Sequence, residues 1–249
     1  LADEYARHRP EYPPRLFAHL ASLCPRTDLA WDCGTGNGQA ARGLAEHFHR
    51  VIATDASAEQ IRRAFPHERV DYRVATAEEA DLDPGSVDLV AVAIAVHWFD
   101  LDRFYAKVQR VLRPAGVLAV WTYHHARIDP EIDALVCRYY EDTLAGFWPP
   151  QVRLIEDHYR TLPFPFEELH APALHMEADW DLHQLAGYLS SWSAVFKYQR
   201  HHGRHPLETL WKDLSRAWGP ERRKRRVLWP LHMRVGAASP RPASASSSS

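Results

Sequence analysis

Hydrophobic and polar positions in the first half of the chain alternate between two patterns. Short apolar runs predict five strands, at residues 29–32, 51–55, 70–74, 87–94 and 117–121. Between them, apolar residues recur at helical spacing, most clearly at 14–24, 39–48 and 101–112. Strands that alternate with helices are typical of an α/β fold, in which a parallel sheet is covered by helices on both faces.

The second half of the chain has a different pattern. Residues 123–167 are helical in spacing and rich in aromatic side chains. A strand is predicted near 169–180, helices follow through 182–218, and a last strand is predicted at 227–235. The late strands flank the helical residues, so we expect a seven-stranded sheet with an inserted helical cap.

These patterns predict one domain over residues 1–236. Its core would be 29–121, and the helical cap would lie within about 122–225. The tail, 237–249, consists almost wholly of Ala, Ser and Pro, and we expect it to be disordered because it cannot bury a core.

Composition changes this picture little. The 249 residues are 46% hydrophobic and 25% charged, which is ordinary for a globular protein. No apolar run approaches the roughly 20 residues that span a bilayer, and no basic segment followed by an apolar one opens the chain, so a cytoplasmic protein is expected. Three cysteines without paired spacing, Cys24, Cys33 and Cys137, argue against disulfides and a zinc site.

Charge and histidine clusters exclude further classes. A net charge of −2 offers no general attraction for nucleic acid or an anionic membrane. The basic run 222–226 fits a localisation signal or phosphate patch, but a solvated approach to the last strand is favoured. His201, His202 and His205 have no acid or cysteine at ligand spacing, so no metal is predicted.

A glycine turn after the first strand carries the main chemical signal. Residues 32–38 read Asp-Cys-Gly-Thr-Gly-Asn-Gly, and the second strand ends at Asp55. Glycine lets the chain turn tightly and lets a ligand approach closely. A carboxylate at the end of the next strand can accept both hydroxyls of a ribose. Asp32 and Asp55 would therefore frame one bound nucleoside.

The glycine spacing separates two nucleotide folds. A dinucleotide fingerprint would need its third glycine at position 39, which is Gln39. The pattern that fits is acid-x-G-x-G-x-G. An NAD-type oxidoreductase stays the alternative, together with a binding protein of the same fold that has lost activity.

Six ordered motifs carry a resemblance. They are residues 5–13, the turn at 32–38 with 54–57, 77–78, 86–90, 97–100 and 111–114. Together they resemble class I S-adenosylmethionine-dependent methyltransferases, in particular the methyltransferase type 11 domain and the group around trans-aconitate methyltransferase. The resemblance runs from the first residues to Gly236 and is most specific over about 30–121. It implies a Rossmann-like, mostly parallel sheet with an antiparallel last strand, and methyl transfer to a small molecule, with a carboxylate or hydroxyl favoured.

The resemblance also implies a cofactor site for S-adenosylmethionine. Asp55 would bind the ribose hydroxyls, Thr76, Ala77 and Glu78 would follow the adenine edge, and Ala93 would offer backbone to the methionyl end. The full set of expected cofactor residues is Asp32, Gly34, Thr35, Gly36, Gly38, Asp55, Ala56, Thr76, Ala77, Glu78 and Ala93.

Residues for the methyl acceptor are read from the segment after the fourth strand and from the cap. His97 is the candidate catalytic base, because its pKa is ordinarily near neutrality; the alternative is a hydrogen bond to a neighbouring loop. Trp98, together with its neighbour Phe99, and Trp148 are candidates for the wall of the substrate pocket. If the acceptor is a carboxylate, no base is needed, and an arginine is expected to hold it: Arg9 is the chosen candidate, and Arg7 and Arg160 are the others.

Overall fold

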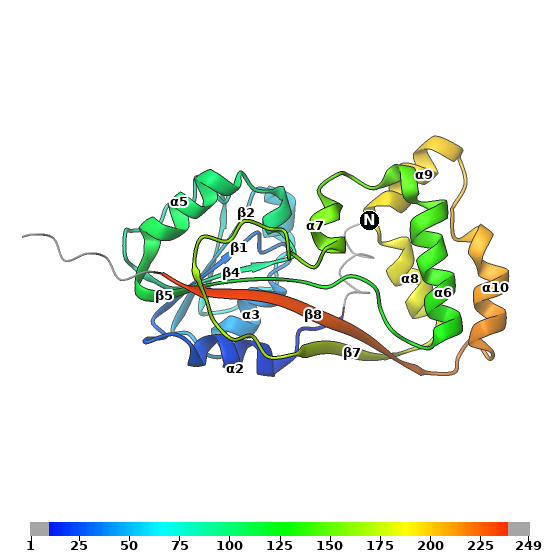
Figure 1. Cartoon of the computed structure of the whole chain (residues 1–249), viewed down its shortest axis with the longest axis horizontal. Coiled ribbons are helices and arrows are strands. Elements are labelled where there is room, and N and C mark those ends of the chain that lie inside the picture. The colour runs from blue at the N-terminus through cyan, green and yellow to red at the C-terminus, as the bar shows by residue number, and fades with distance from the viewer. Residues whose placement is uncertain (1–9, 239–249) are drawn as a thin grey trace, which may run out of the picture. The chain divides into compact units, whose positions relative to one another are not determined.

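The structure is a computed structural model that describes residues 10–238. These residues form two compact units (Figure 1). The sheet unit consists of 13–122, 159–172 and 232–238. The helical unit consists of 10–12, 123–158 and 173–231. The expected cap residues supply most of the helical unit, while the organisation as one domain stays a prediction.

The sheet unit is built on five parallel strands. They are β1 (Leu29–Cys33), β2 (Arg50–Asp55), β3 (Val70–Val74), β4 (Val87–Ala93) and β5 (Leu112–Thr122). The last strand, β8 (Arg225–Ala237), pairs antiparallel with β5, and the short β6 (Glu167–Glu168) pairs antiparallel with β8. The order is β3-β2-β1-β4-β5-β8-β6. The predicted fold class, a mostly parallel sheet with an antiparallel last strand, is confirmed.

The strand expected at 169–180 differs from the prediction. Only its second part is a strand, β7 (Leu174–Trp180), which pairs with the first half of β8, while the short β6 lies just before the predicted range and pairs with the end of β8. Pro172 lies between the two. Proline has no backbone N–H to give to a strand ladder, so pairing breaks at this point.

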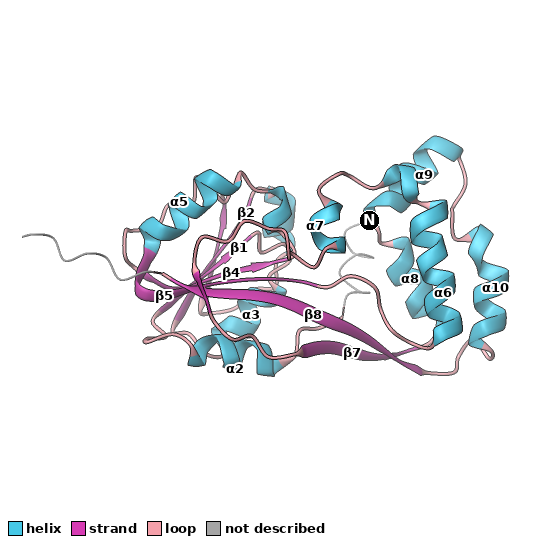
Figure 2. Ribbon diagram, viewed as in Figure 1, coloured by secondary structure: helices cyan, strands magenta, loops and turns pink. Residues whose placement is uncertain are grey.

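Helices cover both faces of the sheet, as expected. The helices of the sheet unit are α2 (Pro14–Ser22), α3 (Gln39–Ala45), α4 (Ala58–Arg63) and α5 (Leu101–Val111), with a 3₁₀ turn, η1 (Val96–Trp98). Figures 1 and 2 show α5 on one face and α2 with α3 on the other. Pro14 fixes the first turn of α2, and Leu16, Phe17 and Leu20 on its inner side are buried.

Burial explains why the central strands β4 and β5 consist mostly of apolar residues. From Val87 to Val92 every residue of β4 is buried, and so is every residue of β5 from Gly116 to Thr122. A parallel strand covered on both faces has no solvent side, so it does not alternate apolar with polar residues.

The helical unit contains most of the aromatic side chains noted in the sequence. Its helices are α6 (Pro130–Arg138), α7 (Val152–Glu156), α8 (Leu182–Ser190), α9 (Ser193–His202) and α10 (Glu208–Trp218), with the turns η2 (Tyr139–Thr143) and η3 (Ala145–Phe147). Asp181 and Gln184 form a reciprocal cap at the start of α8. The rings of Trp180, Tyr188 and Trp229 lie 4.7 to 5.6 Å apart between centroids and form its core.

The end of the sheet differs from the prediction. The strand β8 extends to Ala237, which pairs with Val117, so the first residue of the expected tail is part of the sheet. The rest of that tail from 239 to 249, and the candidates Arg7 and Arg9, lie outside the described residues.

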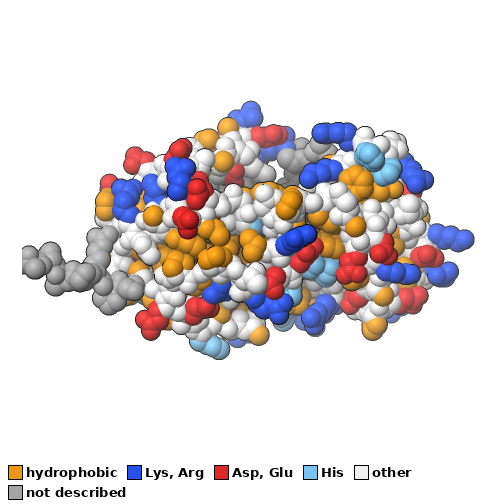
Figure 3. All heavy atoms as spheres, turned by 45° about the horizontal axis from the view of Figure 1, so that its top comes forward, with side chains coloured by type: hydrophobic (Ala, Val, Ile, Leu, Met, Phe, Trp, Pro, Cys, Tyr) orange, Lys and Arg blue, Asp and Glu red, His pale blue; other side chains and the backbone are white. Residues whose placement is uncertain are grey.

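Two further observations concern membrane spans and surface charge. Among residues 10–238, no helix combines the length and the apolar character needed to cross a membrane. On the face drawn in Figure 3, acidic and basic side chains are interspersed, consistent with a net charge of −2.

Candidate functional site

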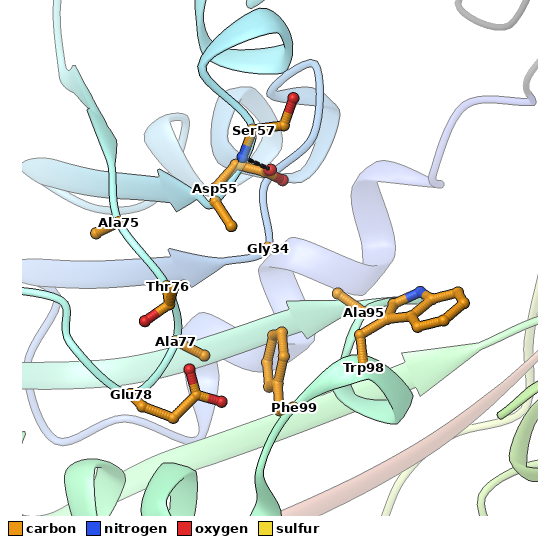
Figure 4. Close-up of a pocket in the computed structure, with 11 residues that line it drawn as sticks. Gly34, Asp55, Ser57, Ala75, Thr76, Ala77, Glu78, Ala95, Trp98 and Phe99 are labelled. Carbon is orange, nitrogen blue, oxygen red and sulfur yellow. Dashed lines mark hydrogen bonds between the residues drawn. The ribbon is translucent and has the colours of Figure 1, made fainter.

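A cavity of about 330 Å³ lies in the sheet unit. Its walls come from the segments that follow β1, β2, β3 and β4, all at the carboxyl ends of these strands (Figure 4). The lining residues are Gly34, Asp55, Ala56, Ser57, Ala75, Thr76, Ala77, Glu78, Ala95, Trp98 and Phe99.

The strand order explains why a cavity forms here. From β1 the chain steps outward through β2 to β3, and β4 then returns to the other side of β1. The connections leaving β1 and β4 therefore diverge, and they leave a crevice at the carboxyl ends of the strands. Open α/β sheets bind their ligands at such switch points.

The glycine turn is held against the end of β2. The amides of Gly34 and Thr35 both donate to the carbonyl of Thr54, over 2.8 and 2.9 Å. Gly34 has φ +72°, and a Cβ built on it would lie 2.5 Å from the Cβ of Ala95. The turn after β1 therefore approaches the segment after β4 so closely that it requires glycine at this position.

The other two glycines of the turn serve different purposes. Gly36 has φ +56°, and a Cβ there would meet no atom within 4 Å. Gly38 has φ +85°, and a Cβ there would collide with the ring of Tyr72. Gly36 thus borders open space that a ligand can use, while Gly38 allows β3 to pack on the turn.

Asp55 is fixed by backbone before any ligand arrives. The amide of Gly36 donates to its Oδ2 over 2.9 Å, and the amide of Ser57 donates to its Oδ1 over 2.8 Å. Figure 4 shows the Ser57 bond at one end of the cavity. Each carboxylate oxygen has a further lone pair, so Asp55 can still accept two hydroxyl groups.

Asp32 lies behind the turn rather than in the cavity. It is fully buried, and the Thr35 hydroxyl donates to its Oδ2 over 2.5 Å. Burial raises the pKa of Asp32 to about 7, against the Thr35 bond, which lowers it. Asp32 therefore acts on the turn through Thr35.

The residues after β3 form one long wall. Ala75 donates its amide to the carbonyl of Asp55 over 3.0 Å, which ties this wall to the end of β2. At its far end, Glu78 accepts the amide of Asp100 at Oε1 over 2.9 Å. Figure 4 shows Asp55 and Glu78 at opposite ends of the row of small residues 75–77. The cavity therefore has a fixed carboxylate at each end.

The opposite wall follows a sharp bend after β4. Ile94 has φ +51°, which is rare for a branched side chain, and its amide donates to the carbonyl of Trp121 over 2.9 Å. The bend turns the chain into η1 and brings Ala95, Trp98 and Phe99 to the cavity. Trp98 is 58% exposed, so an aromatic face is open to solvent at this wall.

Comparison with known proteins assigns the chain to a family. Residues 31–120 match the model of a methyltransferase domain. A protein of Dictyostelium discoideum that is named as a methyltransferase is 34% identical over 222 residues, which are 88% of this chain and 84% of that protein. The chain belongs to the methyltransferase family.

Solved structures agree with this assignment. A protein of Anaeromyxobacter dehalogenans described as a type II methyltransferase is 49% identical, with a TM-score of 0.87 over 93% of this chain and 99% of that one. A methyltransferase of Anabaena variabilis described as coming from an antibiotic biosynthesis pathway is 20% identical, with a TM-score of 0.51 over 86% of this chain and 96% of that one. The second likeness concerns the fold alone.

In this methyltransferase, eight of the predicted site residues line the cavity: Gly34, Asp55, Ala56, Thr76, Ala77, Glu78, Trp98 and Phe99. Six others belong to the sheet unit but are not among the lining residues: Asp32, Thr35, Gly36, Gly38, Ala93 and His97. Three lining residues were not among the predicted ones: Ser57, Ala75 and Ala95. Their position along the sequence could have identified them, because each is next to or near a predicted residue at the end of a strand.

His97 has a partner that the sequence could not supply. Its Nδ1 lies 3.0 Å from the hydroxyl of Tyr159, which is 62 positions away. His97 is 7% exposed, and burial lowers its pKa to about 4. The sequence analysis gave a hydrogen bond to a neighbouring loop as the alternative for His97, and the contact with Tyr159 is of this kind. The role of His97 as a catalytic base stays a prediction.

Trp148, the other aromatic candidate, belongs to the helical unit. Its ring stacks on Tyr140 at 4.4 Å between centroids, and its indole N–H donates to the Tyr140 carbonyl over 3.2 Å. Both contacts hold Trp148 within its own unit, and its part in an acceptor pocket stays a prediction.

Proposed function

We propose that this methyltransferase moves a methyl group from S-adenosylmethionine to a small-molecule acceptor, with a carboxylate or hydroxyl favoured. The observation that carries the proposal is the cavity at the carboxyl ends of β1 to β4, with Asp55 already oriented by the amides of Gly36 and Ser57. The family of the chain supports methyl transfer, and the resemblance in the glycine turn supports the cofactor.

The residues of the cavity fit this cofactor. Two carboxylates, Asp55 and Glu78, line it, and no Lys or Arg is among its described lining residues. Such a site favours a ligand that donates hydrogen bonds or carries positive charge. The open space beside Gly36 leaves room for a ligand against the turn. A ribose, an amino group and a sulfonium all match these properties.

Each residue has a definite task in the proposal. When bound, S-adenosylmethionine supplies an activated methyl group on a sulfonium. Asp55 accepts the ribose hydroxyls on its remaining lone pairs, and the oxygens of Glu78 accept N–H groups at the other end. The open ring of Trp98 offers a face to a cation.

Positioning supplies most of the acceleration in such a reaction, because the nucleophile, the methyl carbon and the sulfur must be in line. A carboxylate acceptor is ionised at neutral pH and needs no base. A hydroxyl acceptor must give up a proton. The sequence offers His97 for that task, and the two acceptor classes therefore make different demands on this residue.

The alternative of an NAD-type oxidoreductase is disfavoured by the glycine spacing and by the segment 97–100. The third glycine that a dinucleotide turn needs is replaced by Gln39, and His-Trp-Phe-Asp at 97–100 belongs to the methyltransferase resemblance. The other alternative, a protein that binds the cofactor without turnover, requires a measurement of activity.

Calorimetry with the full chain tests the cofactor. S-adenosylhomocysteine is expected to bind, and Asp55→Ala is expected to weaken binding at least about a hundredfold, since two charge-assisted hydrogen bonds are lost. Asp83→Ala, at an exposed carboxylate, is the control and should bind normally. Binding of NAD in place of S-adenosylhomocysteine, or binding that ignores Asp55→Ala, would refute the proposal.

A screen with radiolabelled S-adenosylmethionine tests turnover. Small carboxylic acids, phenols and amines are offered in turn, and label in the product identifies the acceptor class. Cofactor binding without turnover on any of them would favour the inactive binding protein.

A further inference from the structure

The hydroxyl of Tyr159 lies between two polar side chains of the sheet unit. His97 Nδ1 is 3.0 Å from it on one side, and the Thr122 hydroxyl bonds to it on the other. Tyr159 and Thr122 are both fully buried. Because no solvent reaches this group, the single proton of the Tyr159 phenol goes either to His97 or to Thr122.

The chemistry of the three groups favours one direction. The phenol has a single proton to donate, and an imidazole nitrogen is a stronger acceptor than a hydroxyl oxygen. Burial raises the pKa of Tyr159, so the phenol keeps its proton. Tyr159 therefore donates to His97 Nδ1, and Thr122 donates to the Tyr159 oxygen.

Tyr159 is held firmly in this position. Its backbone has φ +60°, a left-handed conformation that a non-glycine residue adopts only when its surroundings impose it. Arg234 supplies part of that constraint, since it donates to the carbonyl of Leu162 over 2.5 Å and to that of Tyr159 over 3.4 Å, and it also pairs with Glu168. The phenol is thus anchored against η1, which contributes Trp98 to the cavity wall.

The second nitrogen of His97 is in a different situation. No described residue bonds to Nε2, and this atom is not among the buried polar atoms that lack a partner, so it is open to solvent or a ligand. The ring has one nitrogen engaged by Tyr159 and the other available.

We propose that Tyr159 is a positioning residue that fixes His97 as the Nε2–H tautomer, so that His97 offers a hydrogen-bond donor, and not a proton acceptor, at its open nitrogen. The ligand that matches this nitrogen is an oxygen with a free lone pair. The inference deepens the proposed function, because it specifies what His97 gives to a methyl acceptor. The tautomer itself does not depend on that function.

Among the described residues, no charged side chain shifts the pKa of His97. The rings that face His97 are those of Trp98 and Tyr159, at 5.0 and 6.2 Å between centroids. The low pKa of His97 is caused by burial alone, which fits a ring that stays neutral. A neutral ring with Nδ1 accepting must have its hydrogen on Nε2.

Nitrogen-15 NMR of the full chain, labelled at histidine, tests the proposal without cofactor or acceptor. His97 is identified among the 16 histidines as the signal that disappears in His97→Gln. The long-range ¹H–¹⁵N pattern should be that of a ring protonated at Nε2 only, unchanged over about pH 5 to 8. A pattern of protonation at Nδ1, or titration near the ordinary value, would overturn the proposal in the unmodified protein.

Two matched variants test the part played by Tyr159. Tyr159→Phe removes the donor and should mix the two tautomers of His97. Tyr105→Phe removes another buried phenol hydroxyl of the same unit, one that donates to the Pro163 carbonyl over 2.5 Å, and should leave the His97 signals unchanged. Equal effects of the two variants, or an unchanged His97 in Tyr159→Phe, would refute the role of Tyr159. These results are separate from calorimetry on Asp55→Ala, so the failure of one proposal is distinguishable from the failure of the other.

Discussion

The hydroxyl of Thr35 donates to the carboxylate of Asp32 over 2.5 Å, inside a turn where Asp32 has no exposed surface. A carboxylate in this position has few ways to compensate for lost hydration. The first effect is on its pKa, which is about 7. The second is on folding, because the unfolded chain holds the same group at its ordinary value near 3.8.

The pH dependence of unfolding should report Asp32. Between about pH 4 and 7 the folded state binds a proton that the unfolded state has released. The contribution of Asp32 to the free energy of unfolding is therefore present at low pH and lost as pH rises through 7. The loss is on the order of 4 kcal/mol, because the pKa lies near 3.8 in the unfolded chain and near 7 in the folded one. Asp32→Asn has no such proton to lose. In urea unfolding, the free energy of unfolding of Asp32→Asn minus that of the unmodified protein should rise between pH 5 and 8. Asp83→Asn, at an exposed site, is the control, and a flat difference for Asp32→Asn would contradict the prediction.

Gly36 and Gly38 should respond differently to alanine. Gly36→Ala places its methyl group in open space, so it adds only left-handed strain, about 1 kcal/mol, while it narrows the room against the turn. Gly38→Ala forces the ring of Tyr72 to move and should cost more, about 2–3 kcal/mol. Unfolding and calorimetry with S-adenosylhomocysteine separate the two effects. Gly36→Ala should weaken binding of S-adenosylhomocysteine more than its small loss of unfolding free energy suggests. A larger loss of unfolding free energy in Gly36→Ala than in Gly38→Ala would contradict the roles given to the two glycines.

Ala115 is a site where glycine should stabilise the protein. It is exposed, has φ +60°, and follows Pro114 where the register of β5 against β4 is shifted. Relief of left-handed strain should raise the free energy of unfolding of Ala115→Gly by about 1 kcal/mol, less the entropy cost of glycine. Ala106→Gly, at an exposed position inside α5, should lower it by about 1 kcal/mol. Thermal unfolding checks both signs, and a destabilised Ala115→Gly would show that the backbone at Ala115 is not strained.

Turnover should distinguish a donor from a base at His97. The side-chain amide introduced by His97→Gln can donate a hydrogen bond near the position of Nε2 but cannot take a proton at neutral pH. If His97 is a donor, kcat/KM on the acceptor found in the screen should fall only a few-fold in His97→Gln and about tenfold or more in His97→Ala. Equal and large losses in both variants would support the base.

The parallel half of the fold could be predicted because its signal is local. Burial on both faces makes β1, β2, β4 and β5 mostly apolar, and the structure has β1, β2 and β4 within one residue of their expected bounds and β3 at 70–74 as predicted. The strand β5 begins five residues before the predicted start, at Leu112. The division of β6 from β7 was missed, although Pro172 was a sign of it.

The cavity was predictable where position along a strand decides the answer. Asp55 and Glu78 follow the ends of β2 and β3, and parallel strands bring those ends to one edge of the sheet. The sequence does not show which polar side chains are buried or which distant residues they contact. Nothing in the local pattern tells that Asp32 is covered, or that Tyr159 reaches His97 across 62 positions. Such facts depend on long-range packing.

The strand β8 contributes residues 225–231 to the helical unit and 232–237 to the sheet unit. The helical unit is built from three separate described segments of the chain, 10–12, 123–158 and 173–231. Exchange of this unit between relatives would therefore require three grafts. The last graft must end inside a strand, between Leu231 and His232, where the hydrogen-bonding partner changes from β7 to β5. Any chimera designed to alter the choice of acceptor has to keep the register of β8 on both sides of that junction.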